Sequence, residues 1–246
     1  MDITKLFLEL ASHDRINILK ILDKEKKRLT SIAEEIDETV QETYRNLIRL
    51  IRAKLIDKDK EGYYTLTPFG RYILMILPTI EFLCENREYL LTHDLSKIPK
   101  QFIHRISALK NSKRAPDTLT ALQYIELLIR ESKEYIWTIT EQILASKNQE
   151  IIQKTKEVLF KIILPDNFKP PPGITINFKM NRNIDIRYIQ SIDVALILNE
   201  RRACLAFPWI NGEIDYKGFL IEDKDGYEWC KDLFQYYWKK SRFLPQ

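Results

Sequence analysis

The segment from Thr39 to Ile56, TVQETYRNLIRLIRAKLI, carries side chains whose types and spacing suit contact with nucleic acid. An arginine can form two hydrogen bonds to guanine, and a glutamine or asparagine can do the same to adenine. Val40, Leu47 and Leu50 recur at helical spacing and are expected to face a core, which turns the opposite side of the helix outward. The candidates on that outward side are Gln41, Glu42, Arg45, Asn46 and Arg49.

Each member of this set has an expected role. We expect Arg45 to read a guanine, and Gln41 or Asn46 to read an adenine. Arg49 lies a turn further along the helix and is better placed for a phosphate. Glu42 is the unusual member, because a carboxylate that faces DNA lowers the affinity unless it accepts from a cytosine or orients an arginine.

Two flanking groups would extend this surface. Thr30 and Ser31 stand at the start of a preceding helix and can bind a phosphate through a side chain and a backbone N–H. Lys58, Lys60 and Tyr63 follow the arginine-rich helix and would reach an adjacent groove or the DNA backbone. Taken singly, all of these residues are compatible with ordinary solvated surface positions, so the case depends on the elements that hold them.

Capping residues predict where the helices begin. Thr39, with Glu42 three residues later, has the spacing of a capping box and predicts a helix that starts at Val40. Thr30 is the expected cap of the short helix before it.

The run DKDKEGYYTLT, residues 57–67, has charged residues and one glycine between two β-prone stretches, which predicts a hairpin. Thr67 and Pro68 then predict the start of a long apolar helix that reaches about Leu91 and is kinked at Pro78.

The rest of the chain alternates helices with strand-length runs of β-branched and aromatic residues, a pattern typical of a mixed α/β domain. Strands are expected at 135–144, 158–165, 184–189, 193–198 and 203–210. Helices are expected at 116–135, 147–157 and 225–241. The expected fold class is therefore α+β, with a helical and hairpin-containing domain over 1–92 and a mixed α/β domain over 93–246.

The stretch LTSIAEEIDETVQETYRNLIRLIRAKLIDKDKEGYYTLTPFG, residues 29–70, resembles the winged helix-turn-helix core of archaeal and bacterial ArsR- and MarR-type regulators. The resemblance implies double-stranded DNA as the partner, with the second helix of the pair in the major groove. One departure is Lys54, where such regulators commonly carry glycine to end the helix in a left-handed turn. We therefore expect a strained turn at Lys54.

Three later segments resemble the methanogenesis-regulator middle-domain family, which follows a winged helix in archaeal proteins. They are LTHDLSKIPKQFIHRISAL (91–109), DVALILNERRACLAFPWINGEIDYKGF (193–219) and YEWCKDLFQYYWKKS (227–241). The patterns HD…IP, AFP…G…DY and W…LF…YYW occur in this order. The resemblance implies a C-terminal regulatory or effector domain.

Charged residues at expected strand ends and turns are candidates for binding a small-molecule effector, because ligand sites gather there in α/β sheets. They are Arg187, Asp193, Arg201 and Asp215. A plain hairpin turn over Asn199–Arg202 is at least as compatible with Arg201, and a plain turn role is at least as compatible with Asp215. We interpret His93–Asp94 as a helix-end cap rather than a site, and the aromatic residues of 225–241 as core or dimer packing.

Composition and absent motifs exclude other classes. The 39 basic and 35 acidic residues leave a net charge of +4, which permits nucleic-acid binding without arguing for it. The three cysteines lie far apart without a CxxC pair, so no metal, cofactor or disulfide is expected. The sequence has no GxSxG, HExxH, His-x-Lys or glycine-rich phosphate motif, so no enzyme is expected. No signal peptide or bilayer-length apolar run is present, and a reduced cytoplasmic protein is the expectation.

The sequence thus predicts a sequence-specific DNA-binding regulator that acts as a homodimer, because one winged helix makes few base contacts and dimers bind two half-sites. The helix from Thr67 to Leu91 is the expected dimer contact, unless it packs on its own second domain. The alternative is a winged helix that docks a protein of the transcription machinery instead of reading DNA. A continuous positive stripe would favour DNA, and broken or acidic patches would favour protein.

Overall fold

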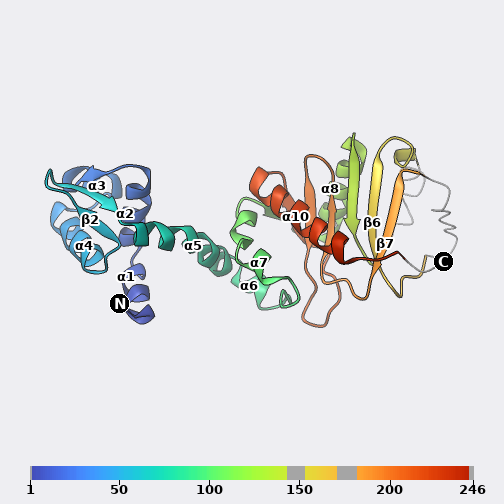
Figure 1. Ribbon diagram of the computed structural model, residues 1–246, viewed down its shortest axis with the longest axis horizontal. Helices are drawn as coiled ribbons and strands as arrows, with labels where there is room; N and C mark the ends of the chain where they lie inside the picture. The colour runs from blue at the N-terminus through green and yellow to red at the C-terminus, as the bar shows by residue number, and fades with distance from the viewer. Residues whose placement is uncertain (1, 143–152, 171–181, 244–246) are drawn as a thin grey trace. The chain divides into compact units, whose positions relative to one another are not determined.

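The computed structural model of the protein describes residues 2–142, 153–170 and 182–243 (Figure 1). It is a mixed α+β structure that divides into two compact units, Met1–Ile80 and Glu81–Gln246. The division falls before residue 92, because Phe82 and Tyr89 pack in the apolar core of the second unit. Each unit is described below by itself.

The first unit is built from helices around a small sheet. Its elements are α1 (Ile3–Leu10), α2 (His13–Lys24), β1 (Lys27–Arg28), α3 (Leu29–Ile36), α4 (Val40–Arg52), β2 (Ile56–Lys58), β3 (Tyr63–Leu66) and the start of α5 (Pro68–Glu85). The strands form an antiparallel sheet in the order β1-β3-β2. Ile18, Ile32, Leu47, Leu50 and Leu55 are fully buried between these elements.

Most predicted helix starts are confirmed. The Thr39 hydroxyl accepts from the backbone N–H of Glu42 at 3.2 Å, and α5 begins at Pro68 with the Thr67 hydroxyl accepting from Gly70 N at 3.0 Å. The prediction that Thr30 caps α3 is wrong. Strand β1 runs directly into the helix, so Arg28 is the capping position and Thr30 lies inside the first turn.

The long apolar helix is shorter than predicted. Helix α5 continues past Pro78 and ends at Glu85, and a separate short helix, α6, spans Arg87–Leu90. Asn86 separates the two helices, and its side-chain amide donates to the carbonyl of Phe82 at 2.9 Å, near the end of α5.

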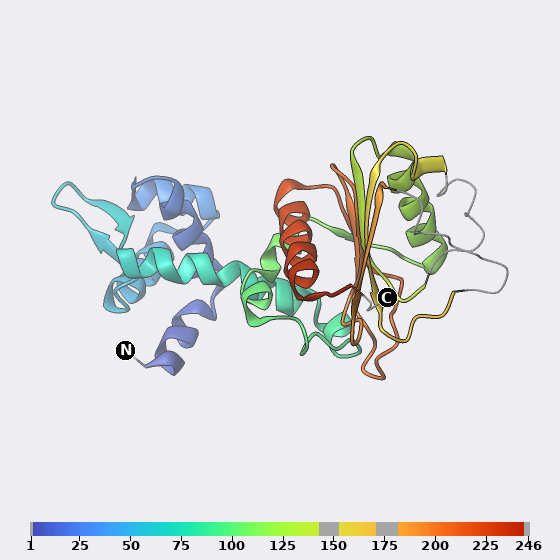
Figure 2. The same cartoon turned by 45° about the vertical axis from the view of Figure 1, so that its right-hand side comes forward.

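The second unit is a seven-stranded sheet with helices on both faces (Figure 2). Its remaining elements are α7 (Lys100–Ile103), η1 (Ile106–Leu109), β4 (Lys113–Arg114), α8 (Thr118–Glu131), β5 (Tyr135–Ile139), β6 (Leu159–Pro165), β7 (Ile184–Ile189), β8 (Ala195–Leu198), β9 (Ala203–Ala206), β10 (Phe219–Ile221) and α10 (Lys224–Lys240). The strand order is β4-β10-β9-β8-β5-β6-β7; the neighbouring pairs β5–β6 and β6–β7 are parallel, and the other described pairs are antiparallel.

The helices of this unit cover opposite faces of the sheet. Ile129 of α8 packs with Ile136 and Phe160, whereas Trp229 and Phe234 of α10 belong to the larger core on the other face. The expected packing role of the aromatic residues in 225–241 is thus confirmed for this core. The predicted strand 135–144 ends at Ile139, and its last two residues, like 147–152 of a predicted helix, lie outside the described residues.

Two features limit how much backbone the edge strands of the large sheet leave open to pairing with another strand. Strand β4 is only two residues long. At the other edge, Arg242 pairs with Tyr188 of β7 through two backbone hydrogen bonds of 2.7 and 2.9 Å.

No described helix is long and apolar enough to cross a bilayer. The described residues also contain no group of three or more His, Cys, Asp and Glu side chains placed to bind a metal ion.

Candidate nucleic-acid interface

Most residues in the N-terminal half of α4 are exposed. Leu47 and Leu50 are fully buried as predicted, and Gln41, Glu42 and Arg45 are exposed. The prediction that Val40 faces the core is wrong, because Thr43 occupies that position and Val40 is 48% exposed. Val40 and the equally exposed Tyr44 therefore add apolar surface to the outward side, which suits contact with a thymine methyl group or with a protein.

Arg45 is held by its neighbour on the helix. Its guanidinium donates to the Glu42 carboxylate at 2.6 Å, while its side chain stays 62% exposed. The arrangement matches the second of the two roles considered for Glu42, that of orienting an arginine. Because the pair is exposed, its contribution to stability is small, and its effect is to restrict where the guanidinium points.

Asn46 is engaged inside the unit. It is half-buried, and its side-chain oxygen accepts from Arg15 of α2 at 3.2 Å. Arg15 also donates to the carbonyls of Leu8 and Glu9 at 3.0 and 2.6 Å, which ties α1 to α2 and α4. Burial, followed by the charge of Arg49, lowers the pKa of Arg15. Adenine recognition by Asn46 would need the same oxygen that Arg15 occupies.

Arg49 is also paired within the unit. Its Nε and Nη2 donate to the two carboxylate oxygens of Glu9, at 2.8 and 3.1 Å. This hydrogen-bonded pair raises the pKa of Arg49. A phosphate would have to compete with Glu9 for the same fork of donors.

The hairpin gathers basic side chains around one aromatic ring. Lys26 and Arg28 each lie over the Tyr63 ring, 4.7 Å from its centroid, and exposed Lys58 and Lys60 belong to the same hairpin. Asp59 closes the turn by accepting from the backbone N–H of Tyr63 and Glu61, and these hydrogen bonds lower its pKa.

Lys26 and Arg28 were missing from the sequence prediction, although the charged run at 23–28 was a signal for them. Thr30 and Ser31 are exposed in the first turn of α3.

The four predicted effector-binding residues of the second unit each contact different partners, so they do not form one site. Arg187 donates to the carbonyl of Trp238 and lies over its ring, 4.3 Å from the centroid. Asp193 accepts from Ser191 at 3.3 Å. Arg201 is an exposed turn residue whose backbone N–H is bound by Asn199, in line with the plain hairpin-turn interpretation. Asp215 is buried and lines a pocket.

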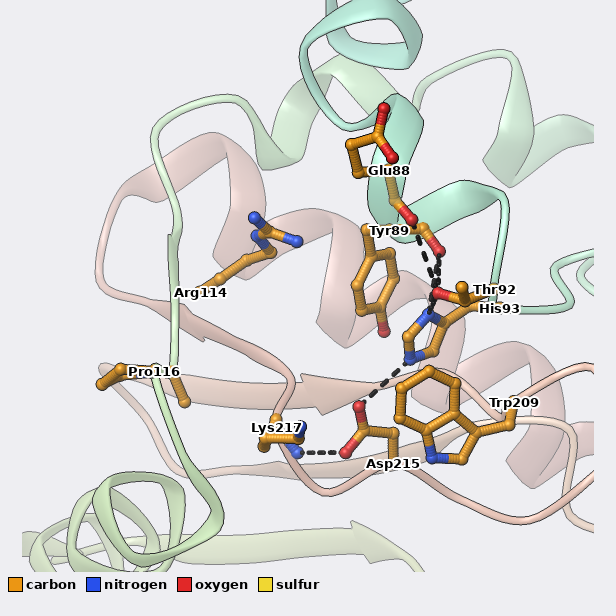
Figure 3. Close-up of a pocket in the computed structure, with 10 residues that line it drawn as sticks. Glu88, Tyr89, Thr92, His93, Arg114, Pro116, Trp209, Asp215 and Lys217 are labelled. Carbon is orange, nitrogen blue, oxygen red and sulfur yellow. Dashed lines mark hydrogen bonds and ion pairs between the residues drawn. The ribbon is translucent and has the colours of Figure 1, made fainter.

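That pocket, of about 360 Å³, lies where the end of α6 meets the segment between β9 and β10 (Figure 3). It is lined by Glu88, Tyr89, Thr92, His93, Arg114, Ala115, Pro116, Trp209, Asp215 and Lys217. His93 does not act only at a helix end: it is buried and its Nε2 lies 3.2 Å from the Asp215 carboxylate. Sequence reasoning identified Asp215 as a candidate and missed the rest, although the HD…IP and AFP…G…DY patterns contain two of these residues, His93 and Asp215.

Comparisons with known proteins give only distant likenesses. No family model matches the sequence, and no curated protein matches it. The solved structure of TrmBL2, an archaeal chromatin protein that binds DNA, aligns over 94% of this chain and 94% of that chain, with 13% identity and a TM-score of 0.44.

An O-methyltransferase family protein from Burkholderia thailandensis aligns over 65% of this chain and 52% of that chain, with 10% identity and a TM-score of 0.29. The riboflavin-derivative dimethyltransferase RosA from Streptomyces davawensis aligns over 76% and 63%, with 8% identity and a TM-score of 0.28. At such TM-scores none of these likenesses bears on what this chain does.

Proposed function

We propose that the first unit is a winged helix-turn-helix that reads the major groove of double-stranded DNA with α4, in a transcriptional regulator of the ArsR/MarR-like type. The observation that carries the proposal is the exposed N-terminal half of α4, capped by Thr39 and followed by the basic hairpin. Helix α3 ends at Ile36, and the three residues Asp37–Thr39, the first in a left-handed conformation, join it to α4, a turn length typical of a helix-turn-helix.

In this proposal the exposed side chains contact DNA, and the side chains that are paired inside the unit hold its helices together. Arg45, oriented by Glu42, reads guanine, and exposed Gln41 reads adenine. Thr30 and Ser31 bind a phosphate, and the hairpin group of Lys26, Arg28, Lys58, Lys60 and Tyr63 contacts the DNA backbone or an adjacent groove. Asn46 and Arg49 hold α1 and α2 against α4 in the free protein.

The regulator acts as a homodimer whose contact includes α5. That helix leaves six large apolar side chains at least one-third exposed: Phe69, Tyr72, Met75, Ile76, Ile80 and Leu83. Helix α1 adds Ile3, Phe7 and Leu8. A second copy would cover such surface and would place two α4 helices on two half-sites. The second unit is then the regulatory part, of the type found in the methanogenesis-regulator family.

The test is binding to genomic DNA fragments, followed by fluorescence anisotropy on a selected fragment over a range of salt concentrations. Arg45→Ala should weaken specific binding by about 1–3 kcal/mol, or roughly 5- to 150-fold, and should relax the preference for one base. Lys24→Ala at the end of α2 is the control, since Lys24 is also an exposed cation of the first unit and lies outside α4 and outside the proposed dimer contact. If the intact protein shows no salt-dependent DNA binding, the proposal fails.

The role of Arg49, as an anchor for α1 or as a phosphate contact, can be determined by comparing the variants Arg49→Ala and Glu9→Gln. If Arg49 only anchors α1, the two substitutions weaken the anchor alike and leave the salt slope unchanged. If Arg49 releases Glu9 and binds a phosphate, Arg49→Ala lowers the slope of log K against log salt by about 1, and Glu9→Gln does not lower it.

Docking of a protein of the transcription machinery is the second candidate. Exposed acidic residues precede α4, with Glu34 in α3 and Asp37 and Glu38 in the turn, and exposed Val40 and Tyr44 add apolar area. Under this alternative, Val40→Asp would abolish binding to a protein partner, and Arg45→Ala would leave DNA binding unchanged.

A further inference from the structure

The pocket in the second unit has a wall of stacked rings. The His93 ring is stacked between Tyr89 and Trp209, with centroid distances of 3.6 and 4.2 Å (Figure 3). Tyr89 is buried, its hydroxyl accepts from the backbone N–H of Phe207, and burial raises its pKa, so this phenol carries no charge at neutral pH. Tyr89 and His93 therefore support the half-buried Trp209 ring, which lines the pocket with little freedom to move.

The acidic groups of the pocket are already engaged. Asp215 binds His93 Nε2 at 3.2 Å through one oxygen and the backbone N–H of Lys217 at 3.1 Å through the other. On its other side, the His93 Nδ1 lies 2.8 Å from the carbonyl of Tyr89. Glu88, at the rim, is paired with Arg87 at 2.7 Å.

Two cationic side chains of the pocket have no such partner. Within the described part of the chain, neither Arg114 nor Lys217 forms an ion pair with a carboxylate. Arg114 instead lies over the Tyr89 ring and Lys217 over the Trp209 ring, each 5.7 Å from the centroid. The two cations come from separate segments, β4 and the end of the β9–β10 connection, and both line the cavity.

We propose that this pocket binds a small, flat organic anion. Arg114 and Lys217 hold its carboxylate or phosphate group, and the aromatic wall of Tyr89 and Trp209 accepts its apolar part. A guanidinium matches the geometry of either anionic group. The volume of about 360 Å³ lies at the low end for ligand pockets, which limits the ligand to about the size of one substituted ring.

The proposal stands independently of DNA binding, because it concerns the second unit and is measured without DNA. The experiment is calorimetric titration of the full chain with benzoate, phenyl phosphate and neutral benzamide. We expect one site per chain that takes benzoate or phenyl phosphate and takes benzamide at least tenfold more weakly. The preference between the two anions distinguishes a carboxylate ligand from a phosphate ligand.

Variants separate the pocket from general charge effects. Arg114→Met and Lys217→Met should each weaken anion binding at least tenfold. Lys113→Met is the matched control, since Lys113 is an exposed cation of the same strand that does not line the pocket. Equal binding by the Lys113 and Arg114 variants, equal binding of benzamide and benzoate, or no saturable binding of either anion at millimolar concentration would overturn the proposal.

Discussion

Burial separates the three cysteines into two kinds. Cys84 on α5 is exposed, whereas Cys204 on β9 and Cys230 on α10 are buried. Removal from water raises the pKa of Cys204 to about 12 and raises that of Cys230 well above its ordinary value. The thiolate is the reactive form of cysteine. Both buried thiols are therefore protected from reagents by their raised pKa and by their lack of contact with solvent.

Thiol titration with a disulfide reagent at neutral pH should therefore detect Cys84 alone in the folded protein and all three cysteines in denaturant. Rapid reaction of all three thiols without denaturant would contradict this assignment.

The raised pKa of Cys204 also predicts that the stability of the protein depends on pH. The folded pKa of Cys204 exceeds its unfolded value of 9.0, so its contribution is complete below pH 9 and is lost as the pH rises toward 12. Urea unfolding at increasing pH should show this fall, and Cys204→Ala should make it shallower.

At the scale of the element, the end of α4 is a helix stop made without glycine. Lys54 has a φ of +59°, its N–H binds the carbonyl of Ile51, and the N–H of Leu55 binds that of Leu50. This is the hydrogen-bond pattern of a Schellman motif. The left-handed turn predicted at Lys54 is confirmed, and its side chain makes the conformation unfavourable.

Lys54→Gly should raise the free energy of unfolding by about 0.5–1 kcal/mol, because glycine removes the Cβ strain and keeps the hydrogen bonds. Urea denaturation of the full chain measures the change. Lys54→Ala serves as control, because alanine retains the Cβ atom and should give no such gain. A glycine variant less stable than the alanine variant would show that the turn is unstrained.

Local spacing predicted the parts of the fold that depend on near neighbours. The Thr39 cap and the Thr67–Pro68 start involve residues at most three positions apart, and both are confirmed. The cap at Thr30 was wrong because β1, which displaces it, exists only through pairing with Tyr63 and Tyr64 of β3.

The candidate interface shows the same limit. Helical periodicity indicates which side of α4 faces outward, but it does not show which outward residues meet another helix. Asn46 and Arg49 find their partners 31 and 40 positions away, in Arg15 and Glu9. The pocket joins His93 to Asp215, 122 positions apart, so no local pattern could assemble it.

At the scale of the whole molecule, the two units offer different kinds of chemistry. The first presents a capped helix and a basic hairpin at its surface, and the second holds a pocket whose two cations have no ion-pair partner among the described residues. Helix α5 runs from the hairpin into the second unit, and α6, which follows it after Asn86, supplies Tyr89 to the pocket wall. The pocket and the candidate interface are thus joined by a short stretch of mostly helical chain.

The pairing of Arg242 with β7 has a consequence for how whole molecules behave in concentrated solution. An unpaired edge strand is a template for aggregation, and here the Tyr188 backbone groups are already taken, while the Arg242 side chain binds Asp166 at 2.7 Å. Arg242→Pro removes the backbone donor and should open the edge to intermolecular β-pairing, seen as light scattering that grows with protein concentration. Arg242→Ala, which loses only the ion pair, should stay clear, and that difference would assign the protection of the edge to the backbone N–H of Arg242.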